Sequence, residues 1–347
     1  MINNIDELFL YISNYDIHHS YDRNTIKSIW RKAGSLGVFS CQEDGYSKFL
    51  LEKLCQYDIY DYPFWLQREV ILYLIKRYGT DGQKSKYISG LESGSIIASI
   101  ALTEETGGSD LKNILSFYDD KKSVLSGKKR FITNAAFADI ILYSAKNQDG
   151  KIGLWILDVD DRISIRRINC IPEIAALGFS EIELNDFLVD RNMLLGGFDN
   201  CLIYIMKALS FERYCCAYMS FHLGKKLCSQ NLNWLKNKGD LWNKQILQYK
   251  MAEFISMNSL LDSHFEMLYK KFEKKGNIFT EAAMLKYMSV KNALEITQFS
   301  SLLRAGEFVS LEIDPYINKM YNTIISLSAA GGTQEIMLNI ISESLKI

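Results

Sequence analysis

One stretch of the sequence places backbone N–H groups and hydroxyls where a phosphate could bind. In Ile100-Ala-Leu-Thr-Glu-Glu-Thr-Gly-Gly-Ser-Asp110, an apolar run leads through two glycines to Ser109 and Asp110. Ser and Asp are good helix caps, and the N–H groups at a helix start bind anions. We therefore expect Gly108 and Ser109 to lie at a phosphate site, although an ordinary turn uses the same residue types.

A second stretch, Gly127-Lys-Lys-Arg-Phe-Ile-Thr-Asn134, pairs an aromatic ring with a hydroxyl. In a strand, Phe131 and Thr133 would project from the same side, because side chains alternate with period two. Such a pair suits a flat heteroaromatic ligand. Phe131 would serve equally well as a core residue.

A third stretch, Gly331-Gly-Thr-Gln-Glu-Ile336, opens the last helical run of the chain. Glycine allows close approach of the backbone to a ligand, and a helix N-terminus favours a negatively charged one. The spacing alone does not say which ligand binds there or which side chain reacts with it.

The composition is that of a folded globular protein without a strong charge bias. The chain has 347 residues, of which 48% are hydrophobic, enough to bury a substantial core. Lys and Arg total 40 against 41 for Asp and Glu, so we expect no nucleic-acid or membrane-surface partner. No run of eighteen apolar residues is evident, so no membrane helix is expected.

The cysteines and histidines indicate a reduced, metal-free protein. Seven cysteines are an odd number without a C-x-x-C pair, and adjacent Cys215 and Cys216 in an apolar run are typical of packing residues. We interpret them as reduced, which predicts a cytoplasmic location. The N-terminal residues lack the basic and apolar segments of a secretory signal. The histidines, which are His18, His19, His222 and His264, lie near no Cys or Asp cluster, so no metal site is expected.

Hydrophobic periodicity divides the chain into three parts, so the predicted fold class is α+β and mainly α. Residues 1–95 show helical spacing, residues 96–196 contain short β-branched or alternating segments, and residues 197–347 return to helical spacing. The middle part suits a small antiparallel sheet or barrel. The three prolines stand outside the long C-terminal runs, so helices of twenty or more residues are allowed there.

Taken together, five blocks in this order resemble the acyl-CoA dehydrogenase family across nearly the whole chain. They are Gly79-Thr-Asp-Gly-Gln83, Leu102-Thr-Glu-Glu-Thr-Gly-Gly-Ser-Asp110, Phe131-Ile-Thr-Asn134, Ala208-Leu-Ser-Phe-Glu-Arg213 and Gly331-Gly-Thr-Gln-Glu-Ile336. The resemblance implies an N-terminal helical domain, a middle β domain and a C-terminal four-helix bundle. It also implies an FAD-dependent oxidoreductase, a flavoprotein, that assembles as a homodimer or homotetramer.

The resemblance assigns cofactor-binding roles to particular residues. Leu102 and Thr103 would bind the flavin pyrimidine edge, and Phe131 and Thr133 would cover the ring and contact N5. Gly108 belongs to the same motif as Ser109, which would bind either the FAD pyrophosphate or the pantetheine of the substrate. The residues that would approach the FAD of a partner subunit, or its ribose and phosphates, are Gln298, Gly331, Gly332, Thr333 and Glu335.

The resemblance also implies that the catalytic base is Glu212 and does not come from the position of Gly331. Many members carry a glutamate directly before a Gly-Thr pair, where this chain has Gly331. Members similar to the isovaleryl- and long-chain-type enzymes instead supply the base from a Glu-Arg pair on the first long helix of the C-terminal domain. Glu212 and Arg213 match that pair, so Glu212 would remove the α-proton of an acyl thioester in a dry pocket. Arg213 would contact substrate or stabilise the helix, and Glu212 would otherwise be a helix-surface residue paired with a basic neighbour.

Three segments depart from the family pattern on the side of the FAD adenosine and the subunit contacts. They are Trp234-Leu-Lys-Asn-Lys-Gly-Asp240, Gln298-Phe-Ser-Ser-Leu-Leu303 and Tyr321-Asn-Thr-Ile324. Such a short, divergent chain resembles members of natural-product biosynthesis that oxidise acyl groups on an acyl carrier protein. Acyl-CoA and acyl-carrier-protein thioesters both remain open as substrates, with an electron-transfer flavoprotein or oxygen as acceptor.

Two other classes of function remain open on the same fold. A flavin-dependent monooxygenase would need an oxygen-admitting pocket and no carboxylate base, so Glu212 argues against it. An enzyme that oxidises an alcohol carbon is the other oxidoreductase alternative. A non-catalytic homologue would keep the scaffold for assembly alone.

Overall fold

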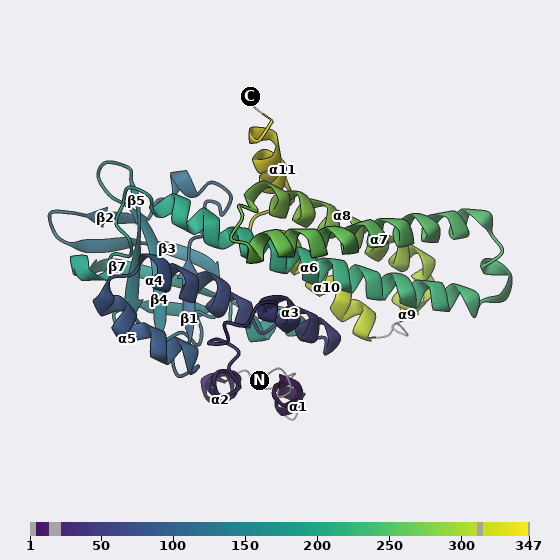
Figure 1. Ribbon diagram of the computed structural model, residues 1–347, viewed down its shortest axis with the longest axis horizontal. Coiled ribbons are helices and arrows are strands. Elements are labelled where there is room, and N and C mark those ends of the chain that lie inside the picture. The colour runs from purple at the N-terminus through teal and green to yellow at the C-terminus, as the bar shows by residue number, and fades with distance from the viewer. Residues whose placement is uncertain (1–4, 14–21, 311–314, 346–347) are drawn as a thin grey trace. The chain divides into compact units, whose positions relative to one another are not determined.

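The computed structural model describes residues 5–13, 22–310 and 315–345, and the chain divides into two compact units, residues 1–212 and 213–347 (Figure 1). The boundary falls inside the long helix α6 (Cys201–Lys236). The N-terminal helices and the sheet belong to one unit. The three-domain division at residues 95/96 and 196/197 stays a prediction, although both positions fall between secondary-structure elements.

The first unit begins with short amphipathic helices. They are α1 (Ile5–Ser13), α2 (Arg23–Ser35), α3 (Tyr46–Gln56), the π-helical segment η2 (Leu66–Leu72) that continues into α4 (Tyr73–Tyr78), and α5 (Asp81–Glu92). Helix α2 starts where the Asp22 carboxylate accepts hydrogen bonds from the backbone N–H groups of Asn24 and Thr25. Helix α5 starts with a capping box between Thr80 and Gln83.

The strands of the first unit form one sheet, which the described residues build from seven strands in the order β1-β4-β2-β3-β7-β6, with β5 paired to β4. Their apolar side chains pack into a core that includes Leu125, Tyr143 and Trp155. The strands are β1 (Ala98–Ala101), β2 (Phe117–Asp119), β3 (Val124–Ile132), β4 (Ile140–Lys146), β5 (Ile152–Asp158), β6 (Ser164–Arg167) and β7 (Ser180–Leu188).

The sheet is mixed, which refines the expectation of an antiparallel sheet. Strands β2–β3, β3–β7, β4–β5 and β6–β7 pair antiparallel, but β4 runs parallel to both β1 and β2. Alternation along a strand reports which side chains are buried and carries no information about the direction of its neighbour. The expectation of short strands within residues 96–196 is confirmed, because β1 to β7 all lie in this range.

Gln67 connects the N-terminal helices to the start of the sheet. Its Oε1 accepts hydrogen bonds from Trp30 Nε1 at 3.1 Å and from the Ala98 backbone N–H at 3.2 Å. Its Nε2 donates to the carbonyl oxygen of Leu91 at 2.9 Å. This buried amide is one direct link between the helices and the sheet of the first unit.

The second unit is helical, as expected for residues 197–347. It contains the end of α6, α7 (Gln245–Glu273), α8 (Phe279–Leu303), α9 (Ala305–Ser310), α10 (Pro315–Ala329) and α11 (Gln334–Glu343). Tyr218 on α6 packs edge-on against Phe265 on α7 with ring centroids 5.2 Å apart. A Cβ at Gly224 would lie 3.1 Å from Ala293, so glycine allows α6 and α8 to approach closely. Helices α10 and α11 both pack on α8.

One stretch of the second unit, Ile317–Glu343, is long and apolar enough to qualify as a membrane span by composition. It consists of two helices, because α10 ends at Ala329 and α11 begins at Gln334. A single such window is weak grounds for a membrane span, so the expectation of no membrane helix stays a prediction.

Candidate active site

The segment after β1 is held by side chains from β3 and β4. Lys129 on β3 donates from Nζ to the carbonyl oxygen of Leu102 at 3.2 Å and to Glu104 Oε1 at 2.8 Å. The Lys129 and Glu104 side chains are 0% and 4% exposed. The carbonyl oxygen of Thr103 accepts a hydrogen bond from the backbone N–H of Arg130 at 2.9 Å. The two residues expected at the flavin pyrimidine edge thus belong to a fixed segment.

Burial and pairing act against each other on these two ionisable groups. Burial lowers the pKa of the Lys129 ammonium, and the adjacent Glu104 carboxylate only partly opposes that shift. For Glu104, burial raises the pKa, but Lys129 and hydrogen bonds from Ser116 and the Leu115 backbone together hold it below its usual range. Both oxygens of Glu104 already accept hydrogen bonds, from Leu115, Ser116 and Lys129.

Phe131 and Thr133 do not project from the same side of a strand, as the sequence had predicted. Phe131 has a left-handed backbone with φ of 56°, and the register of β3 against β7 shifts between Lys129 and Ile132. β3 ends at Ile132, so Thr133 lies in the following turn. The period-two argument is therefore wrong for this pair. Phe131 is 53% exposed, so it is not a core residue, and the Arg130 guanidinium lies over its ring, 5.0 Å from the centroid.

The expected phosphate site at Ser109 lacks an α-helix. Asp110 is followed by a 3₁₀ turn, Leu111–Asn113, and its carboxylate accepts a hydrogen bond from Asn113 Nδ2 at 2.6 Å. The helix-cap prediction is therefore wrong. A Cβ at Gly108 would lie 2.8 Å from Thr103 Cγ2, so glycine is needed there for the loop to fold back on the strand end.

The glycine loop before α11 is held by two buried cations of the second unit. Arg213, which is 2% exposed, donates from Nε to the carbonyl oxygen of Gly331 at 3.2 Å. Lys286 on α8, which is 0% exposed, donates from Nζ to the carbonyl oxygens of Ala330 and Gly332. Three successive carbonyls are thus bound by α6 and α8.

Arg213, expected to contact substrate or to stabilise the helix, and Gly332, a residue of the expected FAD loop, are therefore engaged within the protein. The Arg213 guanidinium also lies over the Phe279 ring, 5.1 Å from its centroid. These contacts favour the interpretation that Arg213 supports the local structure. Sequence reasoning missed Lys286 because its partners are backbone atoms far along the chain.

Gln334 lies in the Gly331-to-Glu335 loop that was expected to approach the FAD, but sequence reasoning gave it no role of its own. Its Oε1 and Nε2 atoms are both buried, and neither has a hydrogen-bond partner among the residues that the structure describes. A buried amide without partners is costly, which indicates that a ligand or a partner subunit satisfies it. The only available signal was its position at the start of α11, between Thr333 and Glu335.

The remaining residues expected at the site differ in exposure. Glu212 is half-buried and lies on α6 directly before Arg213. Glu335 is exposed, and a hydrogen bond from the Thr333 side chain lowers its pKa. Gln298 is exposed on α8. The described residues contain no cluster of three or more His, Cys, Asp or Glu side chains that would hold a metal, and His18 and His19 lie outside them.

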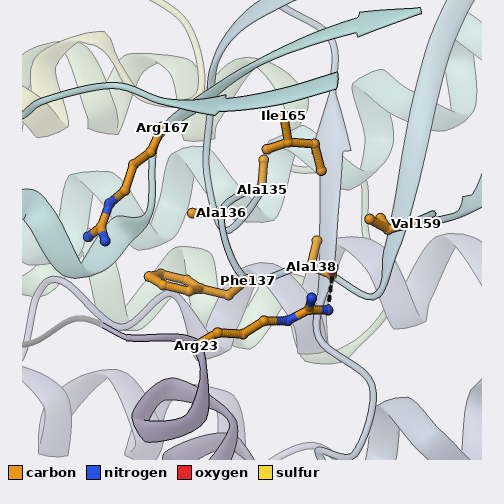
Figure 2. Close-up of a pocket in the computed structure, with 8 residues that line it drawn as sticks. All are labelled: Arg23, Ala135, Ala136, Phe137, Ala138, Val159, Ile165 and Arg167. Carbon is orange, nitrogen blue, oxygen red and sulfur yellow. Dashed lines mark hydrogen bonds between the residues drawn. The ribbon is translucent and has the colours of Figure 1, made fainter. Parts of the chain in front are cut away.

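A cavity of about 320 Å³ in the first unit is separate from these residues. Figure 2 shows Arg23 and Arg167 beside Phe137, with the Arg23 guanidinium directed to Ala138. Arg23 donates to the Ala138 carbonyl at 3.2 Å and to Asp139 at 2.8 Å, and Asp139 also pairs with Lys27 at 2.7 Å. None of the residues expected at the flavin lines this cavity.

Two features of the first unit fit FAD. The exposed Phe131 side chain offers a stacking surface, and the Leu102–Thr103 segment presents a held backbone edge. A flavin carries both a flat ring and polar edge atoms, which match these groups.

Comparison with known proteins places the chain in a family. The family model for the acyl-CoA dehydrogenase middle domain matches residues 99–187, and that for the C-terminal domain matches residues 202–346. The mouse (Mus musculus) mitochondrial long-chain specific acyl-CoA dehydrogenase is 24% identical over 92% of this chain and 79% of its own length. An L-prolyl-[peptidyl-carrier protein] dehydrogenase from Serratia is 25% identical over 78% of this chain and 72% of its own length.

Solved structures share the fold. An acyl-CoA dehydrogenase from Geobacillus kaustophilus has a TM-score of 0.84 and 24% identity, covering 92% of this chain and 90% of that one. An FAD complex of PigA has a TM-score of 0.82 and 19% identity, and the match covers 92% of this chain and 89% of the PigA chain. The matched domain models, the curated relatives and the shared fold together show that this chain belongs to the acyl-CoA dehydrogenase family.

Proposed function

We propose that the protein is an FAD-dependent dehydrogenase that introduces a double bond between the α- and β-carbons of an acyl thioester. Its family membership, and relatives named as dehydrogenases of acyl-CoA and peptidyl-carrier-protein substrates, support this function. When bound, FAD supplies the hydride acceptor for the β-hydrogen. The protein must supply the base that removes the α-proton.

One observation carries the assignment of that base to Glu212. The loop that holds the catalytic glutamate in many relatives has Gly331 at that position, and Gly331 is bound by Arg213, the residue next to Glu212 on α6. Arg213, the second residue of the Glu-Arg pair, therefore contacts the loop in which the family resemblance places the base of other members. The half-buried Glu212 carboxylate would gain basicity from desolvation once substrate excludes water.

The other site residues would bind and orient the cofactor and the thioester. Leu102 and Thr103 would meet the flavin pyrimidine edge, and Phe131 would cover its ring. The buried amide of Gln334 and the N–H groups of the 331–333 loop would meet polar groups of the cofactor or of the thioester. Gln298, Thr133, Ser109 and Glu335 remain assigned by resemblance.

We leave the thioester carrier as either coenzyme A or an acyl carrier protein, because both present the same phosphopantetheine arm. The Serratia relative supports the carrier-protein alternative and a role in biosynthesis. The reduced flavin would be reoxidised by an electron-transfer flavoprotein or by oxygen. We also propose a homodimer or homotetramer in the cytoplasm.

The test is anaerobic titration of the purified protein with acyl thioesters. The protein should be yellow, with absorbance near roughly 450 nm from bound flavin, and a matching thioester should bleach it. Bleaching by NAD(P)H followed by oxygen consumption would favour a monooxygenase instead. A colourless protein that FAD cannot reconstitute would leave only the non-catalytic homologue.

A further inference from the structure

A fully buried lysine lies between the two segments that would contact the flavin. Lys129 precedes Phe131 by two residues on β3, and its Nζ donates to the carbonyl oxygen of Leu102 at 3.2 Å. Nζ also donates to Ser144 Oγ on β4 at 3.0 Å, and that hydroxyl donates to the carbonyl oxygen of Ala101 at 3.0 Å. One ammonium group thus ties the end of β1 to β3 and β4.

Glu104 is the counter-ion, and hydrogen bonds hold both of its oxygens. Oε1 accepts from Lys129 Nζ at 2.8 Å, from the Ser116 N–H at 2.9 Å and from Ser116 Oγ at 2.6 Å. Oε2 accepts from the Leu115 N–H at 2.5 Å. Tyr143 completes the cluster, because its hydroxyl lies 3.1 Å from Ser116 Oγ and its ring lies under the Lys129 ammonium.

Overall stability does not readily explain such a pair. Removing two charges from water costs about as much free energy as their mutual attraction returns. A protein in which apolar residues of similar volume replace a buried ion pair is therefore often at least as stable. What apolar residues cannot do is hold a particular carbonyl oxygen at a particular place. Lys129 does this for Leu102, in the segment that would receive the flavin edge.

We propose that Lys129 and Glu104 are positioning residues for the flavin. The pair holds Leu102 and Thr103 at a set distance from Phe131, so that the pyrimidine edge and the ring face are bound together. This inference rests on the proposed function, since it requires that FAD is the ligand. It assigns no proton transfer to either residue.

The experiment separates positioning from stability through a double substitution. Lys129→Met and Glu104→Gln each leave a buried charge without its partner, so each should lower stability. Lys129→Met/Glu104→Gln removes both charges and should recover much of the stability, but the Leu102 carbonyl still lacks its donor. The matched control is Lys128→Met/Glu183→Gln, because Lys128 is the neighbour on β3 and forms an exposed ion pair with Glu183 at 3.0 Å.

For each full-length protein, the measurements are the FAD dissociation constant, the absorption spectrum of bound FAD and urea unfolding of the FAD-depleted protein. We expect the buried double variant to bind FAD roughly tenfold more weakly or worse, about the effect of one lost hydrogen bond to a charged group, with an altered flavin spectrum. The exposed control should match the wild type in all three.

The outcomes distinguish the two proposals. Wild-type affinity and spectrum in the buried double variant would overturn the positioning role while leaving the proposed function intact. The positioning role would also be overturned if, across the four variants, the affinity for FAD falls only where the stability in urea falls, and by a proportionate amount. A wild-type protein that binds no FAD would overturn both.

Discussion

Arg213 Nε lies 3.2 Å from the carbonyl oxygen of Gly331, so the residue after Glu212 in the sequence holds the glycine loop that precedes α11. Lys286 binds the carbonyls on either side of Gly331.

If Glu212 is the base, Glu212→Gln should keep the fold and the flavin, because the amide matches the carboxylate in size. Flavin reduction by the correct acyl thioester should slow by roughly a hundredfold or more, the range for losing a positioned general base. Anaerobic stopped-flow absorbance measures this rate. Glu212→Gly/Gly331→Glu returns the carboxylate to the loop and would restore part of the activity if both positions reach the α-carbon. Reduction of Glu212→Gln at the wild-type rate would show that the base assignment is wrong.

Lys286→Met should disorder the glycine loop, because the carbonyls of Ala330 and Gly332 lose their donor while Arg213 still holds Gly331. We expect faster amide exchange in residues 330–334 and weaker binding of FAD or thioester, by about tenfold for one charged hydrogen-bond donor. Hydrogen-exchange mass spectrometry and titration measure the two effects. Lys291→Met is the control, since Lys291 lies five residues later on α8 and is exposed. Unchanged exchange in the Lys286 variant would contradict a role in holding the loop.

The second unit should form an interface with another copy of the chain. Ile246, Tyr249, Leu260 and Met267 are 58–76% exposed, and a 100° step per residue puts them on one face of α7. We expect a homodimer or homotetramer that buries more than roughly 2,000 Å² per interface. Leu260→Glu should weaken assembly in analytical ultracentrifugation, whereas Leu188→Glu, at the end of β7, should not. A micromolar monomer that still retains FAD would argue against assembly through this face.

The Glu104 carboxylate should make stability depend on acidic pH. Because the folded state lowers its pKa, its contribution is present above the usual value of 4.5 and is lost as pH falls through the folded value. At pH 7, Glu104→Gln should be less stable than the wild type by roughly 3 kcal/mol, the cost of leaving a buried charge unpaired. Urea unfolding should show that this difference in the free energy of unfolding between the wild type and Glu104→Gln becomes smaller below about pH 4.5. If the difference does not change with pH between 3 and 7, Glu104 is not held as a charged group.

The sequence by itself determined the order of helices, sheet and helices, and the family. Helical and alternating spacing are local properties of the chain, so they identified the strands β1, β4, β5 and β7 and the long C-terminal helices. The motif blocks are also local, which is why they carried the resemblance. The glycine pair at 331–332 was correctly expected to precede the last helix.

The tertiary structure decided how those segments are held. Strand periodicity placed Phe131 and Thr133 together, but a left-handed residue and a register shift end the alternation there. Ser109 and Asp110 look like a helix cap, yet a 3₁₀ turn follows them, because cap residues serve tight turns equally well. The parallel pairing of β1 with β4, the Lys129–Glu104 pair and the binding of the glycine loop by Arg213 and Lys286 join residues far apart in the sequence. Such contacts depend on which elements pack together, and that choice depends on burial and backbone pairing across the whole unit rather than on any one stretch of sequence.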